Sequence, residues 1–134
     1  CCYNETIASS FLEAALAGAG EGLAGTALRE LLSDEIDHAR LGWALVASLD
    51  DQARAEVEPW LLRMAVANLR MWRDAPRLYP DKPALVAHGA PSLAVVEAAL
   101  LAAFRDLILP GLSNAGMDVT PLEAWLDTGA PTAR

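Results

Sequence analysis

The stretch "SDEIDHARLGWA", residues 33–44, places a carboxylate and an imidazole where a helix should carry apolar side chains. Glu35 and His38 are three residues apart, so both project from the same side of a helix. A helical period links the apolar positions around them, which are Leu28, Leu31, Leu32, Ala39, Gly42, Leu45, Val46 and Leu49. Because a buried, unpaired carboxylate is very costly, we expect Glu35 to be paired, protonated or bound to a metal.

The first helix of the chain, expected over residues 2–18, repeats this pattern. Glu5 falls in an apolar stripe, whereas Glu13 falls on the solvent side. The stripe consists of Cys1, Cys2, Ala8, Ser9, Leu12 and Leu16. The glycine-rich segment "GAGEGLAG", residues 18–25, should end this helix, and a second helix is expected over residues 25–49. The two helices are therefore predicted to form an antiparallel hairpin.

Such a hairpin would bring Glu5 level with Glu35 and His38, because each lies about 20 Å of helix from the turn. Two adjacent carboxylates repel each other unless a proton or a cation lies between them. Oxygen ligands with one imidazole suit iron or manganese better than a metal that prefers thiolates. The alternative is a chance E-x-x-H pattern, in which Glu35 pairs with Arg29 or Arg40 and His38 is a satisfied core histidine.

These residues resemble one half of a ferritin-like di-iron carboxylate bundle. That family places a Glu on each of two helices and an E-x-x-H motif on each of the other two. The string "DEIDHARLGWA" is also similar to the D-E-x-x-H-A run of bacterial ferritin-like oxidases and oxygenases. The resemblance covers residues 1–49. It implies Glu5 and Glu35 as carboxylate ligands, His38 as the imidazole ligand, and Asp34 as the acid that orients a ligand histidine of the other half.

Only half of a di-metal site is present in this chain, because it has one Glu and one E-x-x-H contribution. The other histidine, His88, has no Glu three residues before it and is expected at the surface. A further helix pair must complete the site, either as a missing N-terminal half, as a second chain, or as a second copy, as in encapsulated ferritins. The first option is favoured, because the chain starts without Met and already inside a helical pattern. Tyr3 is a candidate hydrogen-bonding residue near the centre, with core packing as its alternative.

The remainder of the chain, residues 50–134, is expected to add helices to a single all-α domain of 134 residues. Helices are predicted over residues 51–73, with Pro59 causing a kink or a late start, and over residues 92–109, ending before Pro110. A proline-rich connection between them holds a short turn at residues 84–87. The sequence "TPLEAW", residues 120–125, predicts a last helix capped by Thr120. An apolar stripe is interpreted as core packing, and it consists of Trp60, Met64, Ala67, Met71 and Trp72.

Composition excludes several classes of protein. Apolar residues make up 54% of the chain and many are Ala and Leu, which favours helix over sheet. The net charge of −8, without any Lys/Arg-rich tract, argues against nucleic acid or an anionic membrane as partner. No apolar run reaches the ~20 residues of a membrane span. The only cysteines, Cys1 and Cys2, are adjacent, so no disulfide framework is indicated and a cytoplasmic location is the default expectation.

Three functions are compatible with these observations. The first is a non-haem di-iron, or Mn/Fe, oxidoreductase that activates O₂ and acts on Fe(II) or on a small organic molecule, towards which the long proline-rich connection inclines the prediction. The second is an encapsulated-ferritin-like ferroxidase formed by self-pairing. The third is a non-catalytic helical subunit or partner-binding module that keeps the scaffold without metal.

Overall fold

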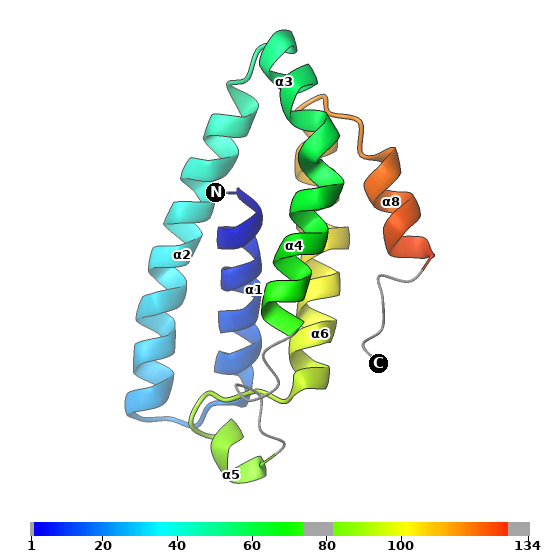
Figure 1. Ribbon diagram of the computed structural model, residues 1–134. Helices are drawn as coiled ribbons and strands as arrows, with labels where there is room; N and C mark the ends of the chain where they lie inside the picture. Colours follow the sequence, from blue (N-terminus) through cyan, green and yellow to red (C-terminus); the bar gives the residue numbers. More distant parts are fainter. Residues whose placement is uncertain (1, 74–81, 129–134) are drawn as a thin grey trace.

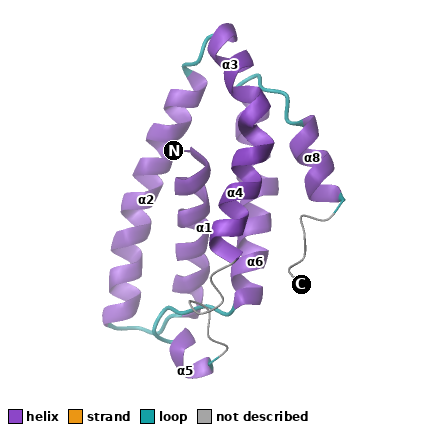
Figure 2. Cartoon of the chain, viewed as in Figure 1, coloured by secondary structure: helices purple, strands orange, loops and turns teal. Residues whose placement is uncertain are grey.

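The computed structural model describes residues 2–73 and 82–128, and all secondary structure in these two segments is helical (Figures 1 and 2). The all-α prediction is therefore confirmed. In chain order the elements are α1 (Cys2–Gly18), α2 (Leu23–Ala47), α3 (Asp51–Val57), the 3₁₀ turn η1 (Glu58–Trp60), α4 (Leu61–Arg73), α5 (Pro83–Val86), α6 (Leu93–Ala102), the π-helical segment η3 (Ala103–Ile108), α7 (Leu109–Asn114) and α8 (Thr120–Asp127). No helix within the described segments has both the length and the apolar character that crossing a bilayer requires.

Helix α1 lies at the centre of the molecule. It forms an antiparallel hairpin with α2, as predicted, and its other side packs against α4, α6 and η3 (Figure 1). Gly22 permits the turn of the hairpin, because its backbone φ of 135° is one that residues with side chains rarely adopt. The backbone N–H of Gly20 also donates to the carbonyl of Ala87, 3.1 Å away, which ties this turn to the end of α5.

The core lies mainly between α1, α4, α6, η3 and α8. Its largest fully buried side chains are Tyr3, Ile7, Val96, Leu100, Phe104, Ile108, Leu112 and Leu122. The rings of Tyr3 and Phe104 pack at a centroid distance of 5.8 Å, and Trp125 of α8 meets Phe104 edge-on. This cluster joins the hairpin of residues 1–49 to the helices that follow it.

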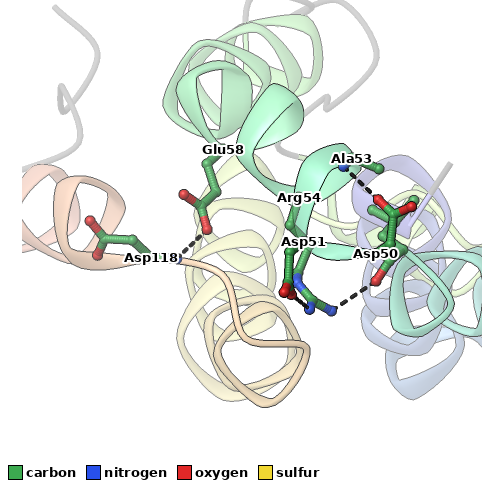
Figure 3. A network of polar contacts seen from close by, with 7 residues as sticks. Asp50, Asp51, Ala53, Arg54, Glu58 and Asp118 are labelled. Atoms are coloured by element: carbon green, nitrogen blue, oxygen red, sulfur yellow. Dashed lines mark hydrogen bonds and ion pairs between the residues drawn. The ribbon is translucent and has the colours of Figure 1, made fainter.

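The connections around α3 follow ordinary capping chemistry (Figure 3). Asp50 is the N-cap of α3, as the sequence predicts, and accepts a hydrogen bond of 2.8 Å from the backbone N–H of Ala53. Arg54 pairs with Asp51 and also donates to the carbonyl of Leu49. The Glu58 carboxylate accepts from the backbone N–H of Asp118, 3.1 Å away, and so attaches the segment before α8 to η1. These contacts fix the turn between α2 and α4.

The predicted core stripe on α4 is wrong for most of its members. Trp60, Met64 and Met71 are 54%, 37% and 58% exposed, and Ala67 is exposed as well, while Trp72 is half-buried. The face that packs inward instead consists of Leu61, Ala65, Leu69 and part of Trp72. Both faces of this helix are apolar, so helical periodicity alone selected the wrong one. The predicted helix over residues 51–73 otherwise holds, with Pro59 in the 3₁₀ turn η1.

The apolar faces of the hairpin are also buried only in part. On α2, Leu31 and Leu45 are 52% and 59% exposed. On α1, the stripe that contains Glu5 is mostly half-buried, and the deepest side chains are Tyr3 and Ile7. The reason is geometrical, because α2 has a helical neighbour on one side only, whereas α1 is surrounded by several helices (Figure 1).

Two helix boundaries differ from prediction. Pro110 does not end the helix that starts after the N-cap Ser92, because the π-helical segment η3 precedes it and α7 continues beyond it. The wider π turn accommodates a residue without an N–H group and keeps its ring away from the preceding carbonyl. Thr120 is not a capping side chain either. Asp118 lies before α8 and its carboxylate accepts from the N–H of Thr120, 2.9 Å away.

The proline-rich connection is described only in part. Residues 74–81 lie outside the described segments, as do Cys1 and residues 129–134. The turn predicted at residues 84–87 is confirmed as the short helix α5.

Candidate metal centre

Glu5 of α1 and the pair Glu35 and His38 of α2 converge across the hairpin, as the sequence predicts. Each offers one ligand atom, and these three atoms all lie within 4.8 Å of one another. His38 Nδ1 lies 3.5 Å from Glu35 Oε2. This is the only group of its kind found within residues 2–73 and 82–128.

The register of the hairpin is fixed close to this cluster. The indole N–H of Trp43 on α2 donates to the hydroxyl of Thr6 on α1, at 3.0 Å. Gly42, four residues after His38, is buried in the hairpin, and its lack of a side chain lets the two helices approach closely. Thr6 follows Glu5 directly, so the hydrogen bond holds the carboxylate of α1 opposite the motif of α2.

The cluster lies at an edge of the fold and not in an apolar interior, which corrects the expectation from sequence. Glu5 and Glu35 are half-buried, but the side chain of His38 is 63% exposed. The cause is again that α2 has no helix on its outer side within the described segments. A metal bound here would be open to solvent or to a further partner.

The electrostatics of the cluster favour a cation. The pKa of the Glu5 carboxyl is raised, first by hydrogen bonding to Glu35, then by burial and by the charge of Glu35, while His38 acts in the opposite direction. Glu35 Oε2 is inaccessible to solvent and accepts no hydrogen bond from a described residue. A metal ion between the two carboxylates would replace the proton of Glu5 and give this oxygen a partner.

The residues fit iron or manganese as a class. They supply two carboxylates and one imidazole, which is a ligand set suited to divalent first-row metals, and they contain no thiolate. Three protein donors leave coordination positions open, and a pair of metals would need further carboxylates. By itself the described chain thus provides half of a di-metal ligand set.

The alternative ion pairs are not formed. Arg40 binds Asp37 at 2.8 Å on an exposed surface, as the sequence suggested, and no ion pair joins Glu35 to an arginine within the described residues. His88 is exposed, as expected.

Two residues predicted to assist the centre lie away from it. Asp34 is exposed, and no contact between it and His38 is found within the described segments. Tyr3 is buried, and its hydroxyl donates to the carbonyl of Leu61 on α4, at 3.3 Å. Burial raises the pKa of Tyr3. Its contacts are those of a core residue.

A groove of about 480 Å³ that sequence reasoning missed lies along the opposite edge of the hairpin. Its lining includes Thr6 and Ser10 of α1, Trp43 of α2, and Asp106 and Gly111 from η3 and α7. These residues are far apart in sequence, and no local pattern links them. The groove could be found only once the packing of η3 and α7 against the hairpin was known.

No protein-family model, no curated protein and no solved structure matches this chain. The ferritin-like resemblance therefore rests on the residues of the α1–α2 hairpin alone.

Proposed function

We propose that this protein binds iron or manganese through Glu5, Glu35 and His38, as one half of a ferritin-like di-metal centre. The observation that carries the proposal is the convergence of three ligand atoms from two helices within 4.8 Å. The proposal is supported further by the inaccessible Glu35 oxygen without a hydrogen-bond donor, which a bound cation would satisfy.

Each residue has a distinct part in this proposal. Glu35 and Glu5 supply negative charge to the metal, and Glu5 must release its proton when the metal binds. His38 supplies a neutral nitrogen from the solvent-exposed side of the cluster. The position of Glu5 is maintained by the contact between Thr6 and Trp43.

We further propose that the completed centre makes the protein a non-haem di-iron, or Mn/Fe, oxidoreductase. When bound, a pair of such ions supplies the redox chemistry that reduces O₂. The substrate is then Fe(II) or a small organic molecule. A cytoplasmic location agrees with Cys2 being a free, buried thiol.

A second candidate function is a non-catalytic helical subunit. The exposure of His38 and the apolar side chains exposed on α2 and α4 favour it, because these features also suit a partner-binding module.

Anaerobic titration with Mn(II), followed by EPR, and with Fe(II), followed by calorimetry, tests the proposed metal site. The wild-type chain should bind either metal, and Glu35→Ala should lose binding. Glu30→Ala is the matched control, because Glu30 is an exposed glutamate on the same helix. If Glu35→Ala and wild type bind alike, the proposed metal site is wrong. Oxygen consumption by the Fe(II)-loaded protein then separates the oxidoreductase from the non-catalytic subunit.

A further inference from the structure

Two exposed apolar stripes run along the helices that flank α1. On α2, Leu31, His38 and Leu45 recur every seven residues, and the two leucines are 52% and 59% exposed. Leu41, on the same side of this helix, is 70% exposed. On α4 the stripe consists of Trp60, Met64, Ala67 and Met71. Monomeric proteins rarely expose so many large apolar side chains in contiguous stripes.

Both stripes border the same edge of α1, which is the edge that carries Glu5. The opposite edge of the hairpin is covered by η3 and α7, which meet Thr6, Ser10 and Trp43 in the groove described above. Helix α4 packs inward through Leu61 and against α8 on a second side, which leaves its methionine stripe directed to the remaining side, next to the hairpin (Figure 1). The metal cluster therefore lies between two exposed apolar stripes.

Opposite charges accompany the two stripes. Glu30 and Asp34 are exposed beside the stripe of α2, and Arg63 and Arg70 are exposed beside the stripe of α4. Arg63 lies over the ring of Trp60, 5.4 Å from its centroid. An apolar surface with an acidic rim on one flank and a basic rim on the other is complementary to a copy of itself turned by 180°.

The charged residues also lie at matching heights. Hydrogen bonds from the first turns of α1 reach Leu61 on one flank and Trp43 on the other, so these two residues lie near the same end of α1. Arg70 follows Leu61 by nine residues and Asp34 precedes Trp43 by nine. Both are thus about 14 Å further along the molecule. A two-fold axis parallel to α1 would keep Arg70 of one copy level with Asp34 of the other.

We propose that a second copy of this chain docks on this face, about a two-fold axis that runs along α1 beside Glu5. The second copy's α2 would lie over α1 and against the methionine stripe of α4. Each helix at the centre would then have antiparallel neighbours, which is favourable for helix dipoles. The choice of occupant rests on the proposed function, because a second set of Glu5, Glu35 and His38 supplies the four carboxylates and two imidazoles of a complete di-metal site.

The first test is the mass of the chain in solution, measured by light scattering with and without Mn(II), together with bound metal per chain. A dimer that binds about one metal per chain supports both the pairing and the proposed function. A monomer that still binds metal overturns the pairing and leaves the function standing. A dimer that binds no metal supports the pairing and overturns the function. A monomer without metal overturns both, and a stable complex with a different helical chain in place of the dimer also overturns the pairing.

Variants on the face test where the copies meet. Leu45→Glu should weaken the dimer by at least ~100-fold, because it buries an unpaired carboxylate at the interface. Leu107→Glu is the matched control, since Leu107 is also about half exposed, at 51%, but lies on η3 beside the opposite groove. Both residues are exposed in the single chain, so thermal melts should show that both variants fold. Equal dimerisation of the two variants would overturn the proposed interface.

Charge reversal tests the two-fold arrangement. Arg70→Glu alone and Asp34→Arg alone should each weaken self-association by about 10-fold, which corresponds to the ~1.4 kcal/mol of one close charge pair. The variant that carries both changes should recover wild-type association, because each changed residue would again face the opposite charge. If the double variant associates no better than the single ones, α2 does not lie against α4 of the second copy.

Discussion

Glu35 Oε2 and His38 Nδ1 lie 3.5 Å apart on α2, at the point where the carboxylate of Glu5 reaches across from α1. Neither glutamate has a cationic arginine or lysine as partner within the described segments, although arginines flank the motif in sequence. Arg40 is bound to Asp37 on the surface. Two carboxylates brought together without a countercharge require a proton or a metal, and this requirement gives rise to the first two predictions.

Without metal, the free energy of unfolding should decrease as the pH rises. The pKa of Glu5 is raised above its ordinary value of 4.5, so the folded protein holds a proton that the unfolded chain releases. The stabilisation from this proton is complete below the unfolded pKa and is lost as the pH rises through the folded pKa. Glu5→Gln should remove this loss and unfold at a higher temperature than wild type near pH 7. Thermal melts from about pH 4 to about pH 8 in the presence of a chelator measure it.

The control for this pH dependence is Glu13→Gln, an exposed glutamate on the same helix. Its melting temperature should follow the wild-type curve. If Glu5→Gln follows that curve as well, the two carboxylates do not interact in the folded protein.

Added Mn(II) or anaerobic Fe(II) should raise the free energy of unfolding. A ligand at one hundred times its dissociation constant stabilises the folded state by about 2.7 kcal/mol. His38→Ala should lose most of this gain because it removes the only nitrogen ligand. His88→Ala should keep it, since His88 is exposed and does not belong to the cluster. The measurement is denaturant unfolding with and without metal, and equal gains for both histidine variants would contradict the assignment of His38 as a ligand.

The hairpin and its cluster could be predicted because their signals are local. Glu35 and His38 occur within one helical turn, and the glycine-rich turn fixes the distance back to Glu5. The spacing of residues then determines which side chains meet. The exposure of His38 could not be predicted, because it depends on which helices lie beyond α2.

The packing of α4 shows the limit of periodicity. Leu61, Ala65 and Leu69 form one apolar face and Trp60, Met64 and Met71 form another, so both are compatible with a core. Only the position of α4 against α1 and α6 decides between them. The continuation of the helix beyond Pro110 was also unpredictable from local rules, because it depends on a π turn within a buried helix.

Tyr3 should act in stability and not in metal binding. Its hydroxyl donates to the carbonyl of Leu61 in the core, so Tyr3→Phe should lower the free energy of unfolding by about 1 kcal/mol. Phe104→Ala, which removes the ring packed on Tyr3, should cost about 3–5 kcal/mol. Leu107→Ala, on the exposed side of the same helix, should change it by less than about 0.5 kcal/mol.

Metal affinity separates the two roles considered for Tyr3. If Tyr3 is a core residue only, Tyr3→Phe binds Mn(II) with wild-type affinity. A large loss of affinity in a variant that is still folded would show that its hydroxyl supports the centre.

Gly111 should not tolerate alanine, although alanine usually stabilises a helix. A Cβ atom built on Gly111 would lie 2.6 Å from two carbons of the Trp43 ring. The ring cannot simply move away, because its N–H is bound to Thr6 at 3.0 Å. Gly111→Ala should therefore cost about 1–3 kcal/mol of stability instead of adding the ~0.5–1 kcal/mol expected of an unstrained helical site. In a Trp43→Leu background the penalty should shrink or reverse, and this double-mutant cycle, measured by denaturant unfolding, isolates the contact between the two helices. If the penalty is the same in both backgrounds, the close approach of Gly111 and Trp43 is not what the glycine serves.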